Sequence, residues 1–293
     1  MKITICALGM KGFKTVEALR NHFEKLELSV VIGTDSAIQD DWSQNLVEYC
    51  ILYKIPHVLS NEITTKMNSS DYTFAIGWRW LIRNIPEEKL VIFHDSLLPK
   101  YRGFAPLVNA LLNKEKLVGV TALLGAKDYD RGDILAQVSH SVTYPTSIER
   151  EILRICNLYS QVAIEIISNL FIDSTRLVGS VQNDAQASYS LWRDADDYSI
   201  DWSQDSEKIL HFISCVGSPY AGAKTTINGR TIRILAATLA PDVRIENRTP
   251  GKIIFLEDGF PIIVCGKGLL KILSAEELGK NLIPWKQFRT RLK

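Results

Sequence analysis

The chain lacks a strong charge of either sign. Its 293 residues include 34 Lys and Arg against 33 Asp and Glu, a formal net charge of +1 at pH 7. Nucleic-acid phosphates are bound by clustered Lys and Arg, so this balance argues against a protein that binds nucleic acid through bulk charge. A local basic patch remains compatible with it.

Long apolar runs are also missing. No run approaches the roughly 20 residues that a helix needs to cross a bilayer. The apolar stretch at residues 3–8 is too brief for a signal peptide and is typical of a short strand. We therefore expect no membrane association.

The cysteines form no pattern. They are odd in number and far apart, and no Cys-x-x-Cys pair occurs among Cys6, Cys50, Cys156, Cys215 and Cys265. Scattered cysteines of this kind usually serve as small buried hydrophobic side chains in proteins of a reducing compartment. We expect a cytoplasmic protein without a metal site.

Strand and helix signals alternate in the first half. Short apolar runs indicate buried strands at 3–8, 28–33, 72–76, 90–94, 118–125 and 134–142. Helical spacing occurs at 13–25, at 43–53 and in a long helix that begins near Ile148. This alternation predicts an α/β fold, a Rossmann-like and mostly parallel sheet with helices on both faces.

The pattern changes after residue 180. Residues 181–188 are small and polar and are interpreted as a linker, and a helix is predicted at 205–215. Short strand-like runs follow at 223–227, 231–238, 251–255, 261–265 and 269–273, and Asn228-Gly229 is a strong hairpin signal. We expect a larger domain at 1–180 and a smaller β-rich, OB-like domain at 188–293.

Chemistry-bearing residues follow the strand at 90–94. Residues 94–106 read His-Asp-Ser-Leu-Leu-Pro-Lys-Tyr-Arg-Gly-Phe-Ala-Pro, and ligands of parallel sheets bind beyond the carboxyl ends of strands. His94 is a candidate general acid or base, and a carboxylate of the Asp128–Asp133 run could orient it. From these residues alone, loop hydrogen bonding explains both side chains better than catalysis does.

The spacing of these residues resembles a known family. His-x-Ser-Leu-Leu-Pro-x-x-Arg-Gly-x-x-Pro, followed by Gly119-Val120-Thr121 and then Asp-x-Gly-Asp, is similar to the formyltransferases that use N10-formyltetrahydrofolate. Residues 75–82, 189–193, 200–202 and 217–223 extend the resemblance over nearly the whole chain. The resemblance implies a transferase with N10-formyltetrahydrofolate as co-substrate and without a metal.

The family's catalytic set of Asn, His and Asp is carried over only in part. The resemblance places the His on His94 and the Asp on Asp130, but the Asn falls on Ile92, which has no hydrogen-bond donor in its side chain. Asn109 and Ser96 are weak candidates to replace it, because helix-surface polarity and a turn hydrogen bond explain them better.

For the folate, the resemblance implies a partly apolar slot. Its members would be Trp78, Arg79, Trp80, Leu81 and Ile82, with backbone groups from the loop of Asp128 and Tyr129 at the polar edge of the pterin. Gly9 and Gly12 lack the third glycine of a dinucleotide-binding motif and indicate a tight strand-to-helix turn.

The local distribution of charged residues bears on which molecule accepts the formyl group. The family's transfer-RNA enzymes carry a basic insertion where residues 34–53 of this chain hold acids and no Lys or Arg. The basic tail at 280–293 is the counter-argument, and a solvated chain end explains it as well.

The chain more closely resembles the sugar N-formyltransferases. That resemblance implies formylation of a dTDP- or UDP-linked amino deoxysugar for surface polysaccharide such as lipopolysaccharide, with no nucleic acid as partner. A diphosphate needs cationic side chains, and Lys100 and Arg102 are our candidates, although Arg102 could instead brace the loop. Trp192 and Tyr220 would stack on the base or fill a domain interface. Sugar members are commonly homodimers.

Two other interpretations are kept. One is a methionyl-tRNA formyltransferase. The other is a catalytically impaired relative that binds folate or a nucleotide, because Ile92 replaces an amide.

Overall fold

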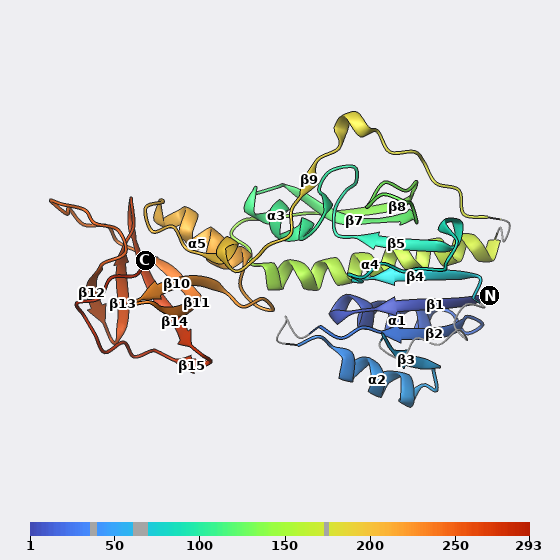
Figure 1. Cartoon of the computed structure of the whole chain (residues 1–293), viewed down its shortest axis with the longest axis horizontal. Coiled ribbons are helices and arrows are strands. Elements are labelled where there is room, and N and C mark those ends of the chain that lie inside the picture. The colour runs from blue at the N-terminus through green and yellow to red at the C-terminus, as the bar shows by residue number, and fades with distance from the viewer. Residues whose placement is uncertain (36–39, 61–69, 173–175) are drawn as a thin grey trace. The chain divides into compact units, whose positions relative to one another are not determined.

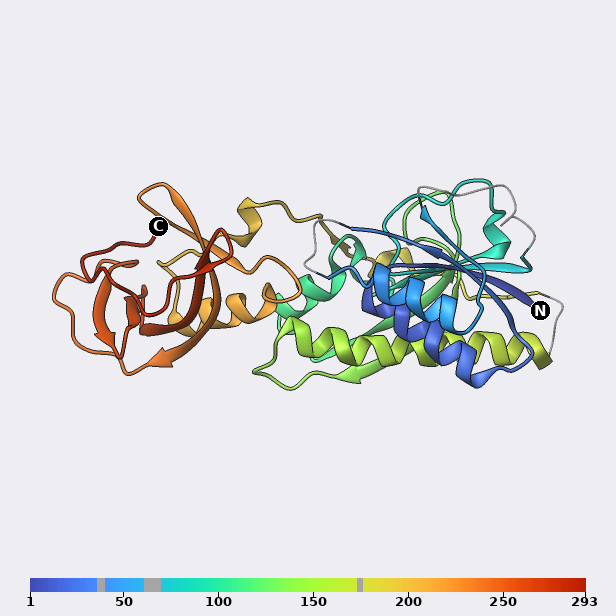
Figure 2. The same cartoon turned by 90° about the horizontal axis from the view of Figure 1, so that it is seen from below.

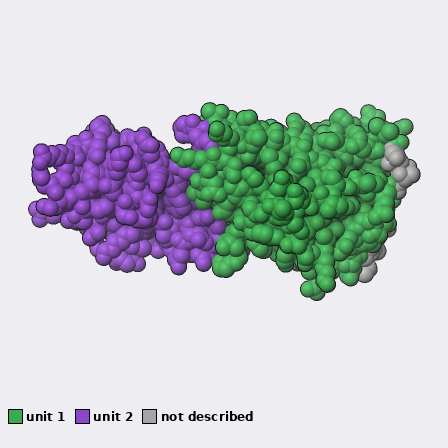
Figure 3. Space-filling view, turned by 90° about the horizontal axis from the view of Figure 1, so that it is seen from above, with its two compact units in different colours: residues 1–143, 150–192 green, residues 144–149, 193–293 purple. Residues whose placement is uncertain are grey.

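The chain forms two compact units. The computed structural model describes residues 1–35, 40–60, 70–172 and 176–293. Unit 1 comprises Met1–Thr143 and Arg150–Trp192, and unit 2 comprises Tyr144–Glu149 and Arg193–Lys293 (Figure 3).

Unit 1 is an α/β unit. Its strands are β1 (Lys2–Ala7), β2 (Glu27–Ile32), β3 (His57–Leu59), β4 (Tyr72–Ile76), β5 (Leu90–His94), β6 (Arg102–Gly103), β7 (Leu117–Leu124), β8 (Ile134–Ser141) and β9 (Tyr189–Ser190). Its helices are α1 (Gly9–His22), α2 (Ser43–Leu52), α3 (Pro106–Leu112), most of α4 (Ile148–Ile172), and the 3₁₀ turns η3 (Glu87–Lys89) and η4 (Asp184–Gln186).

A seven-stranded sheet in the order β3-β2-β1-β4-β5-β7-β8 is the framework of unit 1 (Figure 1). The strands from β3 to β5 run parallel, and β7 and β8 are antiparallel to their neighbours. The predicted Rossmann-like, mostly parallel sheet is therefore confirmed. The strand order reverses between β1 and β4, and ligands of open sheets bind outside the carboxyl ends of the strands at such a point.

Helix α4 packs beside α1 on one face of this sheet (Figure 2). Ser160 of α4 donates to the Lys14 carbonyl oxygen of α1 at 3.3 Å, and the Phe23 and Phe171 rings are 5.4 Å apart. Between β4 and β5, the described chain contains only coil and η3.

Helix α4 is also the one described helix long and apolar enough, by composition, to cross a bilayer. The sequence analysis overlooked this. Its Ile155, Tyr159, Val162 and Ile167 are almost completely buried in the protein. We interpret α4 as a core helix of unit 1, because this apolar face already has protein neighbours.

Unit 2 is β-rich. It contains η5 (Asp196–Tyr198), α5 (Ser206–Cys215), β10 (Ala223–Ile227), β11 (Arg230–Ala240), β12 (Ile253–Glu257), β13 (Phe260–Val264), β14 (Leu269–Glu277) and β15 (Lys280–Asn281). The antiparallel order is β10-β11-β14-β13-β12, with β15 paired to β14. Asn228 and Gly229 have φ values of 50° and 79° in the β10–β11 hairpin, as the sequence predicts.

The polar segment 181–188 is not a linker, and this interpretation was wrong. Gln182 is buried, and β9 extends the segment by pairing in parallel with β6. Its backbone is held as well, since Arg102 N donates to Ser188 O at 2.9 Å. Residues through Trp192 consequently belong to unit 1, whereas the sequence placed the start of the second domain at 188.

Candidate active site

The loop after β5 is fixed by buried polar side chains. Thr121, on the adjacent strand β7, donates to Ser96 O at 2.6 Å and accepts from Leu98 N at 3.1 Å. Gln137 on β8 donates to the same threonine hydroxyl and to Leu98 O, each at 2.8 Å. The chain that follows His94 is therefore held at the edge of the sheet.

His94 and Asp130 are brought together there. His94 ends β5 and is almost fully buried, and its Nδ1 lies 3.5 Å from Asp130 Oδ1. Its other ring nitrogen, Nε2, is 2.8 Å from the Tyr101 carbonyl oxygen. A carbonyl only accepts, so the Nε2–H donates to it, and Nδ1 is the nitrogen that can take up a proton.

Asp130 is positioned by its own loop. Its Oδ2 accepts from Gly103 N at 2.7 Å, and its backbone has φ 55°, a left-handed conformation that Asp tolerates. Gly132 approaches β7 so closely that a Cβ there would lie 1.8 Å from Leu124 O. The Asp-x-Gly-Asp spacing thus aims a carboxylate at His94.

Gln182 connects this loop to Arg102. Its amide donates to the carbonyl oxygens of Asp130 and Gly132, each at 2.8 Å. Its Oε1 accepts from Arg102 Nε at 3.1 Å and from Arg102 Nη2 at 2.8 Å. Sequence reasoning missed Gln182, because an isolated Gln in a polar segment carries no motif.

Arg102 braces the loop. Its side chain is 1% exposed, and its Nη1 donates to Asp184 Oδ1 at 2.7 Å and to Tyr189 OH at 3.4 Å. The guanidinium is therefore engaged on every nitrogen. A diphosphate would have to displace these partners, which favours the bracing interpretation over the substrate-binding one. Lys100 is exposed and stays a candidate.

No amide donor lies beside His94 on β5. Ile92 pairs with Ala75 and Leu123 and is partly buried. Asn109 donates to Ala105 O at 3.0 Å, within its own helical turn. Ser96 donates to Lys100 O at 2.7 Å, a turn hydrogen bond. These contacts support the structural interpretation of both side chains.

Trp78 and Trp80 form the start of the expected slot after β4. Their rings are 5.0 Å apart and edge-on. Both indoles reach Gly33 at the end of β2, where a Cβ would lie 3.0 Å from Trp78 and 2.9 Å from Trp80. The Trp78 Nε1 is buried and has no hydrogen-bond partner among the described residues. A buried donor without an acceptor is costly, so this atom marks a place for a ligand acceptor.

The other expected slot residues are more open. Leu81 and Tyr129 are exposed, Ile82 is partly buried, and Asp128 is exposed. Arg79 forms an ion pair with Asp35. The Tyr129 ring is 6.3 Å from that of Phe104.

A second group of charged residues adjoins His94. Asp95 forms an ion pair with Lys11 of α1 and accepts a hydrogen bond from the Tyr159 hydroxyl of α4. Burial alone raises the pKa of Asp95, but the Lys11 ammonium and the bonds from Lys11 and Tyr159 outweigh it and hold the pKa below its ordinary value. The sequence analysis assigned none of these residues a role.

Trp192 and Tyr220 fall in different units. Trp192 is exposed, and Tyr220 follows Pro219 in unit 2. Their expected role at a nucleotide base stays a prediction.

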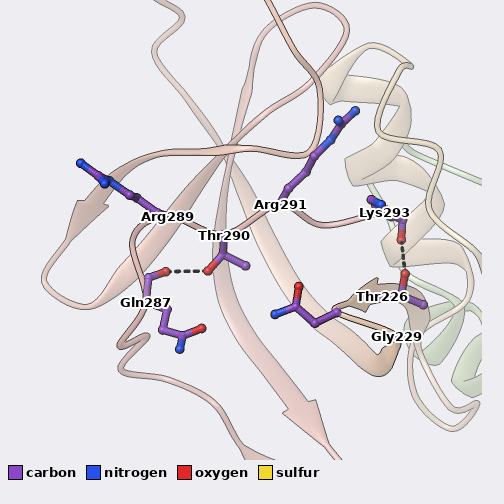
Figure 4. A pocket seen from close by; sticks show the side chains of 8 residues that line it. Thr226, Gly229, Gln287, Arg289, Thr290, Arg291 and Lys293 are labelled. Atoms are coloured by element: carbon purple, nitrogen blue, oxygen red, sulfur yellow. Dashed lines mark hydrogen bonds between the residues drawn. The ribbon is translucent and has the colours of Figure 1, made fainter.

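Unit 2 contains a basic pocket of about 320 Å³ (Figure 4). Its lining comprises Thr226, Asn228, Gly229, Gln287, Arg289, Thr290, Arg291 and Lys293, without an acid. Figure 4 shows the Arg289 and Arg291 side chains pointing in different directions. The sequence analysis noted these cations only as a basic tail.

The described residues contain no cluster of three or more metal-ligating side chains. All five cysteines are buried, and none forms a disulfide. Burial raises the pKa of Cys6 to about 12 and of Cys50 to about 11, so these thiols stay protonated at neutral pH.

Two profiles of one family match the chain. That of the formyl transferases covers residues 76–167, and that of the formyl transferase C-terminal domain covers residues 193–293. The chain belongs to the formyltransferase family. The two matched segments include His94, Asp130 and all of unit 2.

Among curated relatives of this formyltransferase, the methionyl-tRNA formyltransferase of Methylococcus capsulatus is 29% identical over 210 residues. The match covers 71% of this chain and 65% of that protein. The chain thus spans slightly less than two thirds of the length of that relative.

Two solved structures share the fold of this formyltransferase. WlaRD, a sugar 3N-formyl transferase solved with dTDP and 5-N-formyl-THF, has a TM-score of 0.66 and 22% identity, with 96% of this chain and 98% of that chain covered. The N-formyltransferase of Helicobacter canadensis, solved with folinic acid and dTDP-3-aminofucose, has a TM-score of 0.66 and 20% identity, with coverages of 93% and 98%. At these identities the likeness establishes the fold.

Proposed function

We propose that this formyltransferase transfers a formyl group from N10-formyltetrahydrofolate to the amino group of a dTDP- or UDP-linked amino deoxysugar. The observation that carries the proposal is the buried His94–Asp130 pair, 3.5 Å apart at the carboxyl end of the parallel strands. Ligands of open α/β sheets bind at this edge. The family's His and Asp fall on these same two residues.

The slot after β4 fits a folate. It offers two indole faces, and its buried Trp78 Nε1 lacks an acceptor among the described residues. A pterin combines a flat ring with acceptor atoms at its edge, which suits this pairing of aromatic faces and one unpaired donor. When bound, N10-formyltetrahydrofolate supplies the activated formyl group.

His94 is suited to moving the proton in this reaction. A new C–N bond forms between the acceptor amine and the formyl carbon, the bond from that carbon to N10 breaks, and one proton passes from the amine to N10. His94 accepts this proton at Nδ1, while its Nε2–H stays on Tyr101 O. The Asp130 carboxylate stabilises the imidazolium, and proton transfer of this kind contributes about 10²–10⁴ in rate.

The acidic stretch supports a small acceptor. Within the described part of residues 34–53, Asp41 accepts hydrogen bonds from the backbone N–H groups of Asp35 and Ser43. The pKa of Asp41 lies below its ordinary value, because these and further hydrogen bonds outweigh the effect of burial. A carboxylate held ionised here repels an RNA phosphate backbone. Residues 36–39 of this stretch lie outside the described residues.

A direct assay tests the proposal. The protein is mixed with N10-formyltetrahydrofolate and a panel of dTDP-, UDP- and GDP-linked 3- and 4-amino sugars. The expected product is one amino sugar heavier by one formyl group, detected by mass spectrometry. Absence of product across the panel contradicts the sugar assignment.

A second candidate is formylation of methionyl-tRNA. Two observations favour it. The curated relatives with the most similar sequences include methionyl-tRNA formyltransferases, and unit 2 contains a basic pocket. Formylation of initiator methionyl-tRNA in the same assay, with binding that weakens steeply as salt rises, would establish this function instead.

A third candidate is a relative that binds folate or a nucleotide without turning over, because position 92 holds Ile. Folate binding without any formylated product, from sugars or tRNA, would favour it. The rate of formyl transfer by the Ile92→Asn variant distinguishes an impaired enzyme from a site that uses another hydrogen-bond donor. A large gain in rate indicates an impaired enzyme, and little change or a loss indicates a site that uses a different donor.

A further inference from the structure

Lys11, Asp95 and Tyr159 form a charged cluster directly behind His94. The Lys11 and Asp95 side chains are only 17% and 14% exposed. Tyr159 is almost fully buried, and its hydroxyl donates to Asp95 and lies 3.3 Å from Phe93 O. Helices α1 and α4 therefore meet at this carboxylate, which directly follows the end of β5.

The cluster contacts the chain on both sides of His94. Side chains alternate along a strand, so Phe93 faces away from the His94 imidazole. The Tyr159 ring stacks on Phe93 with centroids 5.8 Å apart and planes at 20°. The residue before His94 is thus packed by Tyr159, and the residue after it is held by Tyr159 and Lys11.

Stability alone does not explain this arrangement. Removing two charges from water is costly, and replacing a buried ion pair with apolar residues is often neutral or stabilising. Asp95 is the residue that follows His94 in the chain, so the Lys11–Asp95 pair lies close to the imidazole of the proposed site. Its charges therefore act on that ring through a medium of low dielectric constant.

We propose that Lys11, Asp95 and Tyr159 are positioning residues for His94, and that the opposed charges of Lys11 and Asp95 set the pH range in which its Nδ1 takes up a proton. Tyr159 holds the backbone that flanks the imidazole, and the ion pair keeps the local field balanced. The inference rests on the proposed formyl transfer for its catalytic meaning.

In the part of the chain that the structure describes, few groups near His94 carry charge. Asp130 faces it from the loop after β7, Asp95 follows it directly after the end of β5, and Lys11 of α1 is paired with Asp95. From α4, burial raises the pKa of Cys156 to about 11 and that of Tyr159 well above its ordinary value, so both stay neutral at neutral pH.

From β6, the Arg102 guanidinium is turned to Gln182 and Asp184. Among the described residues, the charges nearest the imidazole are therefore those of Asp130, Asp95 and Lys11.

Single substitutions unbalance this field in opposite directions. Lys11→Met leaves the Asp95 carboxylate without its cation, which favours the imidazolium and moves the His94 titration midpoint to higher pH. Asp95→Asn leaves the Lys11 ammonium, which disfavours the imidazolium and moves the midpoint to lower pH. A nearby charge typically shifts the midpoint of a titratable group by about one pH unit. In the double variant, Lys11→Met with Asp95→Asn, the midpoint returns toward that of the natural protein.

The experiment is an NMR titration of the histidine side chains in the full chain, with His94 assigned by His94→Gln. Lys14→Met is the matched control, since Lys14 lies on the same helix in a more exposed pair with Glu17. It is expected to leave the midpoint unchanged. Opposite shifts in the two single variants, with restoration in the double variant, support the proposal.

Unchanged midpoints, or shifts of the same sign in both single variants, overturn it. A purely structural brace would lower the rate or the stability without this sign pattern. The acid limb of the pH–rate profile for formyl transfer should move with the NMR midpoint. If no formyl transfer is found, the NMR titration still tests the inference, so the two failures are distinguishable.

Discussion

Gln182 Nε2 donates to the backbone carbonyl of Asp130 at 2.8 Å, while the oxygen of the same amide accepts from Arg102. One side chain therefore connects the backbone of Asp130, the residue that bears the carboxylate proposed for catalysis, to a buried guanidinium from β6.

Loss of this connection should lower both stability and rate. Arg102→Met leaves Gln182 Oε1 without its donors, and an unsatisfied buried acceptor costs about 1–3 kcal/mol in the free energy of unfolding. Urea denaturation measures this, and kcat for formyl transfer should fall because the Asp130 loop loosens.

Lys100→Met is the matched control for Arg102→Met. Lys100 is exposed, so its removal should leave the free energy of unfolding unchanged, and KM for a sugar nucleotide rises if the lysine binds diphosphate. An Arg102→Met protein with unchanged stability and a raised KM alone would assign diphosphate binding to Arg102.

Trp78→Phe should weaken folate binding with little effect on stability. The substitution keeps an aromatic ring but removes the Nε1–H, which has no partner among the described residues. Losing one ligand hydrogen bond costs about 0.5–1.5 kcal/mol, up to roughly tenfold in Kd. Fluorescence or calorimetric titration with a tetrahydrofolate measures the Kd, and an unchanged value would remove Trp78 from the slot.

The contribution of Asp95 to stability should vanish in acid. Its pKa is depressed in the folded protein, so its stabilisation is present above the unfolded value near 3.9 and is lost as the pH falls through the folded pKa. The difference in unfolding free energy between the natural protein and Asp95→Asn should therefore be large at pH 7 and shrink below about pH 4.

Glu17→Gln, in the more exposed Lys14–Glu17 pair, should change stability by less than about 0.5 kcal/mol at either pH. If the difference in unfolding free energy between the natural protein and Asp95→Asn stays the same below about pH 4, the ion-pair account is contradicted.

The cysteines should be unreactive in the folded protein. All five are buried, and burial raises the pKa of Cys265 to about 12 as it does that of Cys6. Ellman's reagent should label them only after denaturant is added. Rapid labelling of one thiol under native conditions would show that its segment opens easily.

The sheet of unit 1 could be predicted because its strands are buried on both faces and appear as continuous apolar runs, as at Leu90–His94. The β10–β11 hairpin could also be predicted from the sequence, since Asn228 and Gly229 suit a turn with positive φ. The position of His94 at a strand end follows from this local pattern.

The supporting residues could not be predicted, because they come together only through long-range packing. Gln182 lies 50 residues or more from Asp130 and Gly132, and Lys11 lies 84 residues from Asp95. The polar composition of 181–188 is typical of a linker, yet hydrogen bonds to β6 hold this segment in place. The brace role of Arg102 likewise depends on partners that no local motif indicates.

The most direct test of the account is formyl transfer itself, measured by mass spectrometry on the amino-sugar nucleotide panel with the natural protein, His94→Ala and Asp130→Ala. We expect one sugar nucleotide to gain a formyl group, and a rate loss of about 10²–10⁴ in each variant while folate binding persists. A product formed at near-normal rate by either variant, or formylation of methionyl-tRNA in place of every sugar, would contradict the account.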